Sequence, residues 1–168
     1  MTARLRDAPL LAAWQVRGWA HGATRGPWRG RAVATTCLGA GVPLFALLVA
    51  LMAVQVASRR SRLYLDPGRT AVLGVTATRH GWRIENHAAR YPGTDAGVRL
   101  REVLTPRLLG AADRHGVAIY LDATAPALAH RYAREFDGLE DVGPAPLRGR
   151  RMRRPPSVGP LTEDGSRP

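Results

Sequence analysis

The sequence predicts an α/β protein in which a single transmembrane helix precedes a small open mixed sheet with two helices. The first observation is a stretch of 27 residues without a charge, from Ala32 to Ser58. The second is the order of the segments after it, where runs with strand character are followed by runs of helical period. We therefore divide the chain into a basic segment (1–34), a span (35–57), an α/β domain (58–154) and a tail expected to be disordered (155–168).

The predicted span runs from Thr35 to Ala57, and its 23 residues would form a helix of about 34 Å, against a hydrocarbon core of roughly 30 Å. No signal-peptide cleavage site follows it. The sequence thus predicts a single-pass protein of the cell membrane, with the lipid bilayer as a partner. Small residues at Gly39 and Ala40 would let two spans approach closely, which leaves a homo-oligomer open.

Charge is distributed unevenly along the chain. All 25 basic residues are Arg, against 13 acidic residues. Residues 1–34 carry six Arg and one Asp, whereas residues 59–146 carry thirteen Arg and ten acidic residues. Nucleic-acid binders concentrate positive charge on the folded domain, so we do not expect nucleic acid as a partner. The Arg-rich flanks instead favour anionic lipid headgroups.

The Trp-containing segment before the span allows two interpretations. Leu10, Leu11 and Trp14 would share one side of a short helix, which could lie on anionic lipid with Trp at headgroup depth. The alternative is a poorly ordered basic leader. The single Cys37 excludes an intramolecular disulfide, and no His residues stand at metal-ligand spacing, so no metal site is expected.

The remaining elements follow from periodicity and from turn residues. Apolar β-branched or alternating runs predict strands, and apolar residues three and four positions apart predict helices. The predicted strands are 71–78, 82–89, 117–122 and 147–153, and the predicted helices are 95–115 and 127–136. The turn that opens the first of these helices offers free backbone N–H groups and the positive end of the helix dipole to an anion.

Two runs of this region resemble the second half of the GNAT acyltransferase family. They are ENHAARYPGTDAGVRLREVL, which begins at Glu85, and ADRHGVAIYLDATAPALAHRYAREF, which ends at Phe136. The resemblance implies a truncated GNAT domain that uses acetyl-CoA, with Tyr132 as the general acid for the leaving thiolate. It also implies that the turn's backbone holds the pyrophosphate of the cofactor, through Gly93, Thr94, Ala96 and Gly97.

The turn also departs from the family's pattern. Aligned on Gly97, its first position is Pro92 and its middle glycine is Asp95, whose carboxylate would repel a pyrophosphate. We therefore predict a single-span membrane protein whose α/β domain is a non-catalytic or degenerate GNAT-like interaction module. The alternative is a membrane-tethered N-acyltransferase or acyl-CoA-binding protein. The acyl-CoA resemblance, together with a lone Cys that gives no sign of an oxidising compartment, favours a cytoplasmic C-terminal domain.

Two candidate catalytic residues each have a second interpretation. Glu85 and His87 share one strand face and could act as a general base through a water molecule, or they could be solvated strand residues. Tyr132 stands at helical spacing with Leu128 and Phe136, so it is either the acid or a core residue.

Overall fold

The computed structural model describes residues 1–25, 41–124, 126–145 and 149–157, which form two compact units. The first unit contains residues 1–78 and 84–103, and the second contains residues 79–83 and 104–168. The described residues form six strands, four α-helices and one short 3-10 helix. Two elements, β3 (Gly81–Ala89) and α4 (Ala96–Arg114), begin in one unit and end in the other.

The sheet of the first unit begins at the N-terminus of the chain. Strand β1 (Ser61–Leu65) pairs antiparallel with β2 (Ala71–Thr78), and β3 follows β2. The first residues extend this sheet, because the amide of Ala3 donates to the carbonyl of Leu63 at 2.8 Å and the amide of Leu65 donates to that of Met1 at 2.7 Å. The start of the predicted basic leader is therefore a sheet-forming segment.

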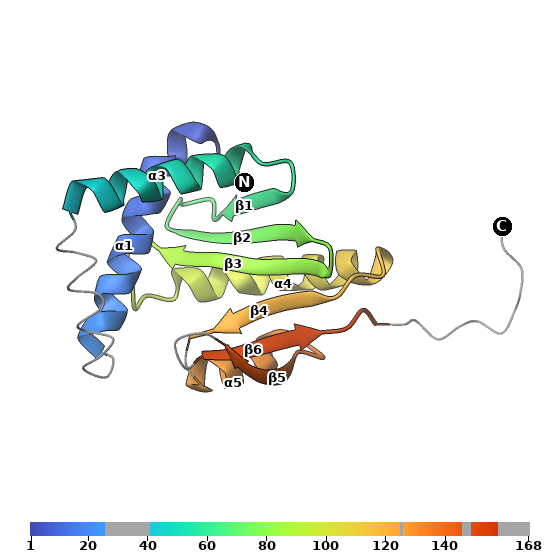
Figure 1. The fold of residues 1–168 in the computed structure, drawn as a ribbon. Coiled ribbons are helices and arrows are strands. Elements are labelled where there is room, and N and C mark those ends of the chain that lie inside the picture. The colour runs from blue at the N-terminus through green and yellow to red at the C-terminus, as the bar shows by residue number, and fades with distance from the viewer. Residues whose placement is uncertain (26–40, 125, 146–148, 158–168) are drawn as a thin grey trace, which may run out of the picture. The chain divides into compact units, whose positions relative to one another are not determined.

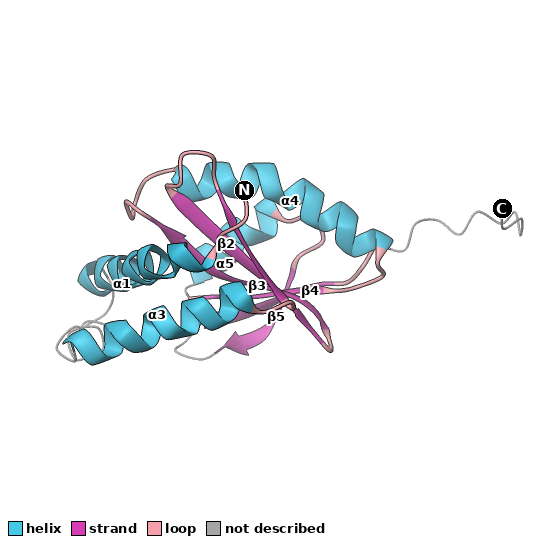
Figure 2. Cartoon of the chain, turned by 90° about the horizontal axis from the view of Figure 1, so that it is seen from above, coloured by secondary structure: helices cyan, strands magenta, loops and turns pink. Residues whose placement is uncertain are grey.

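Two helices cover this sheet. Helix α1 (Ala8–Arg25) follows the 3-10 helix η1 (Leu5–Asp7), and α3 (Gly41–Ala57) runs beside α1 and contacts β1 (Figures 1 and 2). Trp14 is completely buried, and it belongs to one apolar cluster with residues of α3, β1, β2 and β3. Neither interpretation of the N-terminal segment placed Trp14 in a protein core, which is where the structure has it.

The prediction of a transmembrane helix is wrong. In the described parts of the chain, no helix is long and apolar enough to cross a membrane. The 17 residues of α3 extend about 26 Å, short of a hydrocarbon core of roughly 30 Å. Leu48 and Met52 of this helix are buried in the core of the first unit. The predictions of a single-pass protein and of its orientation are overturned with the span; residues 35–40, with Gly39 and Ala40, lie outside the described residues.

The second unit contains the remaining strands. Strand β6 (Gly149–Arg154) lies between β4 (Ile119–Ala123) and β5 (Glu140–Ala145) and pairs antiparallel with both. The start of β3 joins this set, since the amide of Trp82 donates to the carbonyl of Ala118 at 2.8 Å. Gly81 has φ +135°, and a Cβ there would collide with that same carbonyl oxygen, so only glycine fits.

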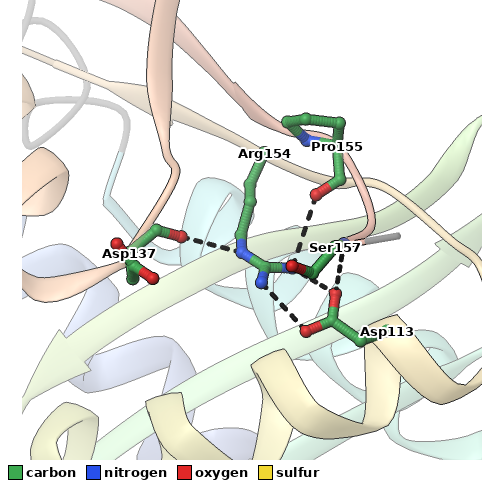
Figure 3. Close-up of polar contacts among 5 residues, drawn as sticks. All are labelled: Asp113, Asp137, Arg154, Pro155 and Ser157. Atoms are coloured by element: carbon green, nitrogen blue, oxygen red, sulfur yellow. Dashed lines mark hydrogen bonds and ion pairs between the residues drawn. The ribbon is translucent and has the colours of Figure 1, made fainter. Parts of the chain in front are cut away.

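A helix and an ion pair complete the second unit. Helix α5 (Pro126–Glu135) packs on β4, β5 and β6, and Phe136, Ile119 and Met152 are fully buried. The guanidinium of Arg154 makes two parallel hydrogen bonds to Asp113, of 2.7 and 2.9 Å, and its Nε donates to the carbonyl of Asp137 (Figure 3). This pairing ties the end of β6 to the last turn of α4. Of the predicted tail, residues 158–168 lie outside the described residues.

Candidate active site

A bulge-like distortion in β3 brings two neighbouring side chains to the same partner. Asn86 has φ +52°, in the left-handed region that Asn tolerates better than most residues. Consecutive strand residues normally point to opposite faces. Here Glu85 and Asn86 both reach the side chain of Gln55 on α3. On β2, a Cβ at Gly74 would lie 3.0 Å from the carbonyl oxygen of Glu85, so a glycine leaves room for this backbone.

Glu85 is held by donors from two other elements. The amide Nε2 of Gln55 donates to Glu85 Oε1 at 2.6 Å, and the hydroxyl of Thr76 on β2 donates to the same oxygen. Thr76 in turn bonds the hydroxyl of Ser61 on β1, with 3.0 Å between the oxygens. All of these residues are buried or half-buried. The network fixes one carboxylate oxygen at a defined place in the first unit.

This arrangement suits proton transfer. A half-buried carboxylate whose position is fixed by hydrogen bonds is a common general base in enzymes. The sequence selected Glu85 for this chemistry, but it did not identify the residues that hold it. Gln55 lies inside the predicted span. The one feature of the sequence that sets it apart is that it is an amide in an otherwise apolar helix.

The predicted phosphate turn leads from β3 into α4. Gly93 has φ +87°, and the hydroxyl of Thr94 donates to the carbonyl of Tyr91 at 2.8 Å, which closes the turn just before the helix begins at Ala96. Gly93, Thr94 and Asp95 are exposed, whereas Ala96 and Gly97 are buried. The turn therefore presents exposed backbone at the N-terminus of a helix of 19 residues.

Gly97 has a packing role within the first unit. A Cβ at this position would lie 2.5 Å from Nε2 of His87. The guanidinium of Arg101, which is 3% exposed, lies 2.8 Å from the same ring nitrogen. Because Arg has only donors, the ring nitrogen that faces it accepts. His87, which the sequence paired with Glu85, thus bonds Arg101 of α4.

Tyr132 lies in the second unit. Its side chain is 8% exposed and makes an edge-to-face contact with Phe136, with 6.3 Å between the ring centroids. Its role as the acid stays a prediction. The same unit has a pocket of about 420 Å³ between α5, β5 and β6, lined in part by His130, Asp141 and Arg150. The residues predicted for the site do not line this pocket.

The chain is similar to several solved structures. An acetyltransferase from Thermus thermophilus matches at 18% identity with a TM-score of 0.56, covering 92% of this chain and 94% of that chain. A spermidine N-acetyltransferase chimera from Vibrio cholerae and hSSAT matches at 15% identity and TM-score 0.46, over 66% of this chain and 76% of that one. An acyl-CoA N-acyltransferase from Pseudomonas aeruginosa matches at 22% identity with a TM-score of 0.42. This match covers 56% of this chain and 66% of that chain.

No family profile matches the chain, and no curated protein matches it. A match over 92% of this chain cannot be confined to residues 85–154, so described residues of the segments predicted as a leader and a span also take part in the shared architecture. The sequence predicted a domain with two helices. That domain is too small, because α1 and α3 also belong to the fold. The chain has a GNAT-like acetyltransferase fold.

Proposed function

We propose that this protein is an acyl-CoA-dependent N-acyltransferase, with acetyl-CoA as the first donor to test. The observation that carries the proposal is Glu85, a half-buried carboxylate held by Gln55 and Thr76 in a fold shared with an acetyltransferase over 92% of the chain. A carboxylate fixed in this way can accept a proton at a defined position, as a general base must.

The turn before α4 has the features that a pyrophosphate requires. Its backbone bends at Gly93, residues 93–95 are exposed, and the helix that follows supplies a positive dipole end. Backbone N–H groups of Gly93, Ala96 and Gly97 would hold the phosphates, together with that of Thr94, which also donates to the carbonyl of Tyr91 at 3.4 Å. Acetyl-CoA would supply an acyl group already activated as a thioester.

Asp95 opposes this binding less than its sequence position suggests. Its side chain is exposed, so water and salt screen its charge. Arg99 stands four residues further along, on the same side of the helix, and Arg90 precedes the turn. Positive charge therefore exceeds negative charge around the turn, which supports binding of an anionic cofactor.

Glu85 would accept a proton from the ammonium group of the acceptor, directly or through one water molecule, so that the neutral amine can attack the acyl carbon. Gln55 and Thr76 would keep the accepting carboxylate in place during this step. Tyr132 is our candidate for returning a proton to the thiolate that leaves.

The test is release of the free thiol of CoA by the purified full chain, with acetyl-CoA and a panel of primary amines that includes spermidine and lysine peptides. We expect turnover with at least one amine, and a loss of about a hundredfold to ten-thousandfold on Glu85→Gln. Glu102→Gln is the matched control, because it makes the same change at an exposed position of α4.

A folded chain that binds acetyl-CoA but gives no turnover with any amine would favour an acyl-CoA-binding protein. A folded chain that neither binds acetyl-CoA nor transfers its acyl group would favour the interaction module. Equal rates for Glu85→Gln and the parent would remove Glu85 from the mechanism.

A further inference from the structure

We infer that Gln55 of α3 is a positioning residue that orients the carboxylate of Glu85, an inference that rests on the proposed function. Gln55 is the one side chain of α3 that can hydrogen-bond, in a helix whose other residues are all apolar or glycine. A half-buried amide in such a setting requires partners. Both of its partners lie on β3, at the two residues that flank the distorted peptide.

The hydrogen bonds have a single consistent direction. An ionised carboxylate only accepts, so the Nε2 of Gln55 faces Glu85 and its Oε1 faces the other way. That oxygen accepts from Nδ2 of Asn86 at 2.6 Å, and Oδ1 of Asn86 faces Nε2 of Gln15 on α1 at 3.5 Å. The amides of Gln15, Asn86 and Gln55 thus form a chain of donors that ends on Glu85.

The left-handed backbone of Asn86 is what makes this chain geometrically available. In a regular strand, residues 85 and 86 would face opposite sides, and one amide on α3 could not bond both. Asn is suited to the position because it adopts φ +52° at low cost and still carries a donor. The left-handed backbone of Asn86 and the amide of Gln55 therefore act together to orient the carboxylate of Glu85.

The experiment is a double-mutant cycle between positions 55 and 85, measured on the full chain with the acceptor amine identified in the thiol-release assay. Gln55→Met keeps the length of the side chain and removes both hydrogen bonds. We expect kcat to fall about tenfold to a hundredfold, as for a misplaced catalytic group, while KM for acetyl-CoA stays within about twofold of the parent. In the Glu85→Gln background, the same substitution should change kcat by less than about threefold, because residues that act as a unit are not additive.

Two further variants separate positioning from folding. Asn86→Gly tolerates the positive φ but deletes the donor to Gln55, so we expect kcat to fall by less than it does in Gln55→Met. Val56→Ala changes the neighbouring half-buried residue of α3 and should leave kcat per folded molecule unchanged.

Equal losses from Gln55→Met with and without the Glu85 carboxylate would overturn the inference and indicate a structural role. An unchanged kcat in Gln55→Met would overturn it as well. A parent chain without acyl transfer would overturn the proposed function itself, which separates the two failures.

Discussion

The two units of this protein hold a carboxylate in different ways. In the first unit, Gln55 and Thr76 donate to Glu85 from neutral amide and hydroxyl groups. In the second unit, the buried guanidinium of Arg154 binds both oxygens of Asp113, and the backbone amide of Ser157 adds a third hydrogen bond. Neutral donors fix the position of a carboxylate and leave its negative charge unbalanced, whereas a guanidinium also balances that charge.

The consequence is visible in the acid–base behaviour of Asp113. The hydrogen bonds from Arg154 and then from Ser157 lower the pKa of Asp113 to about 2. This carboxylate is ionised throughout the neutral range, and its two hydrogen bonds with Arg154 fasten β6 to α4. The comparison therefore separates a carboxylate held by neutral donors, Glu85, from one held in an ion pair, Asp113.

The largest effect on stability is expected in the first unit, which depends on apolar packing of α3. Leu48 is 7% exposed and Leu51 is 52% exposed on the same helix. Leu48→Ala should lower the free energy of unfolding by about 2–4 kcal/mol, because it leaves a cavity in the core. Leu51→Ala should change it by about 0.5 kcal/mol or less. Urea unfolding followed by Trp fluorescence measures both, and equal effects would mean that α3 does not pack as described.

This pair also shows why the span was predicted. Val42, Leu47, Leu51 and Val54 are all more than half exposed, while Leu48 and Met52 on the other side are buried. A hydropathy criterion measures the length of an uncharged run and takes no account of which side has a protein partner. The amphipathic α4 and α5 were placed to within two residues of their ends, because polar residues mark their solvent side.

Strands show the same division. Strand β2 was predicted with its bounds, since AVLGVTAT is apolar and β-branched. Strands β1 and β5 were missed: SRLYL is short and begins with polar residues, and EDVGPA contains both Gly143 and Pro144. Glu85 and the turn could be selected from local sequence, but Gln55 and Thr76 could not, because folding alone brings them to Glu85.

A smaller effect on stability is expected when the ion pair of the second unit, between Asp113 and Arg154, is broken. Asp113→Asn should lower the Tm at pH 7 and leave kcat per folded molecule within about twofold, as expected for a residue that has no part in the proposed reaction. The pKa of Asp113 is depressed in the folded chain, so its contribution to stability is fully present above the unfolded value of 3.8 and is lost as the pH falls towards 2. The difference in Tm between parent and variant should therefore shrink between pH 4 and pH 2. A difference that stays constant over this range, or a large loss in kcat, would contradict the assignment.

The smallest expected effect concerns Asp95, whose charge has two opposite consequences. It weakens the binding of a phosphate, and it stabilises the N-terminus of α4. An exposed carboxylate about 4 Å from a phosphate oxygen costs on the order of 1 kcal/mol in water, which is less than a tenfold change in affinity. The same charge stabilises the N-terminus of α4 by about 0.3–1 kcal/mol. Asp95→Asn removes the charge and keeps a side chain that caps helices well.

We therefore expect Asp95→Asn to tighten acetyl-CoA binding by about threefold to fivefold in calorimetry, with a Tm within about two degrees of the parent. Glu140→Gln, an exposed carboxylate on β5, should leave the Kd unchanged. Weaker binding by Asp95→Asn would mean that the carboxylate contacts the cofactor favourably, for example by ordering the turn. In that case Asp95 would be part of the binding site rather than a departure from it.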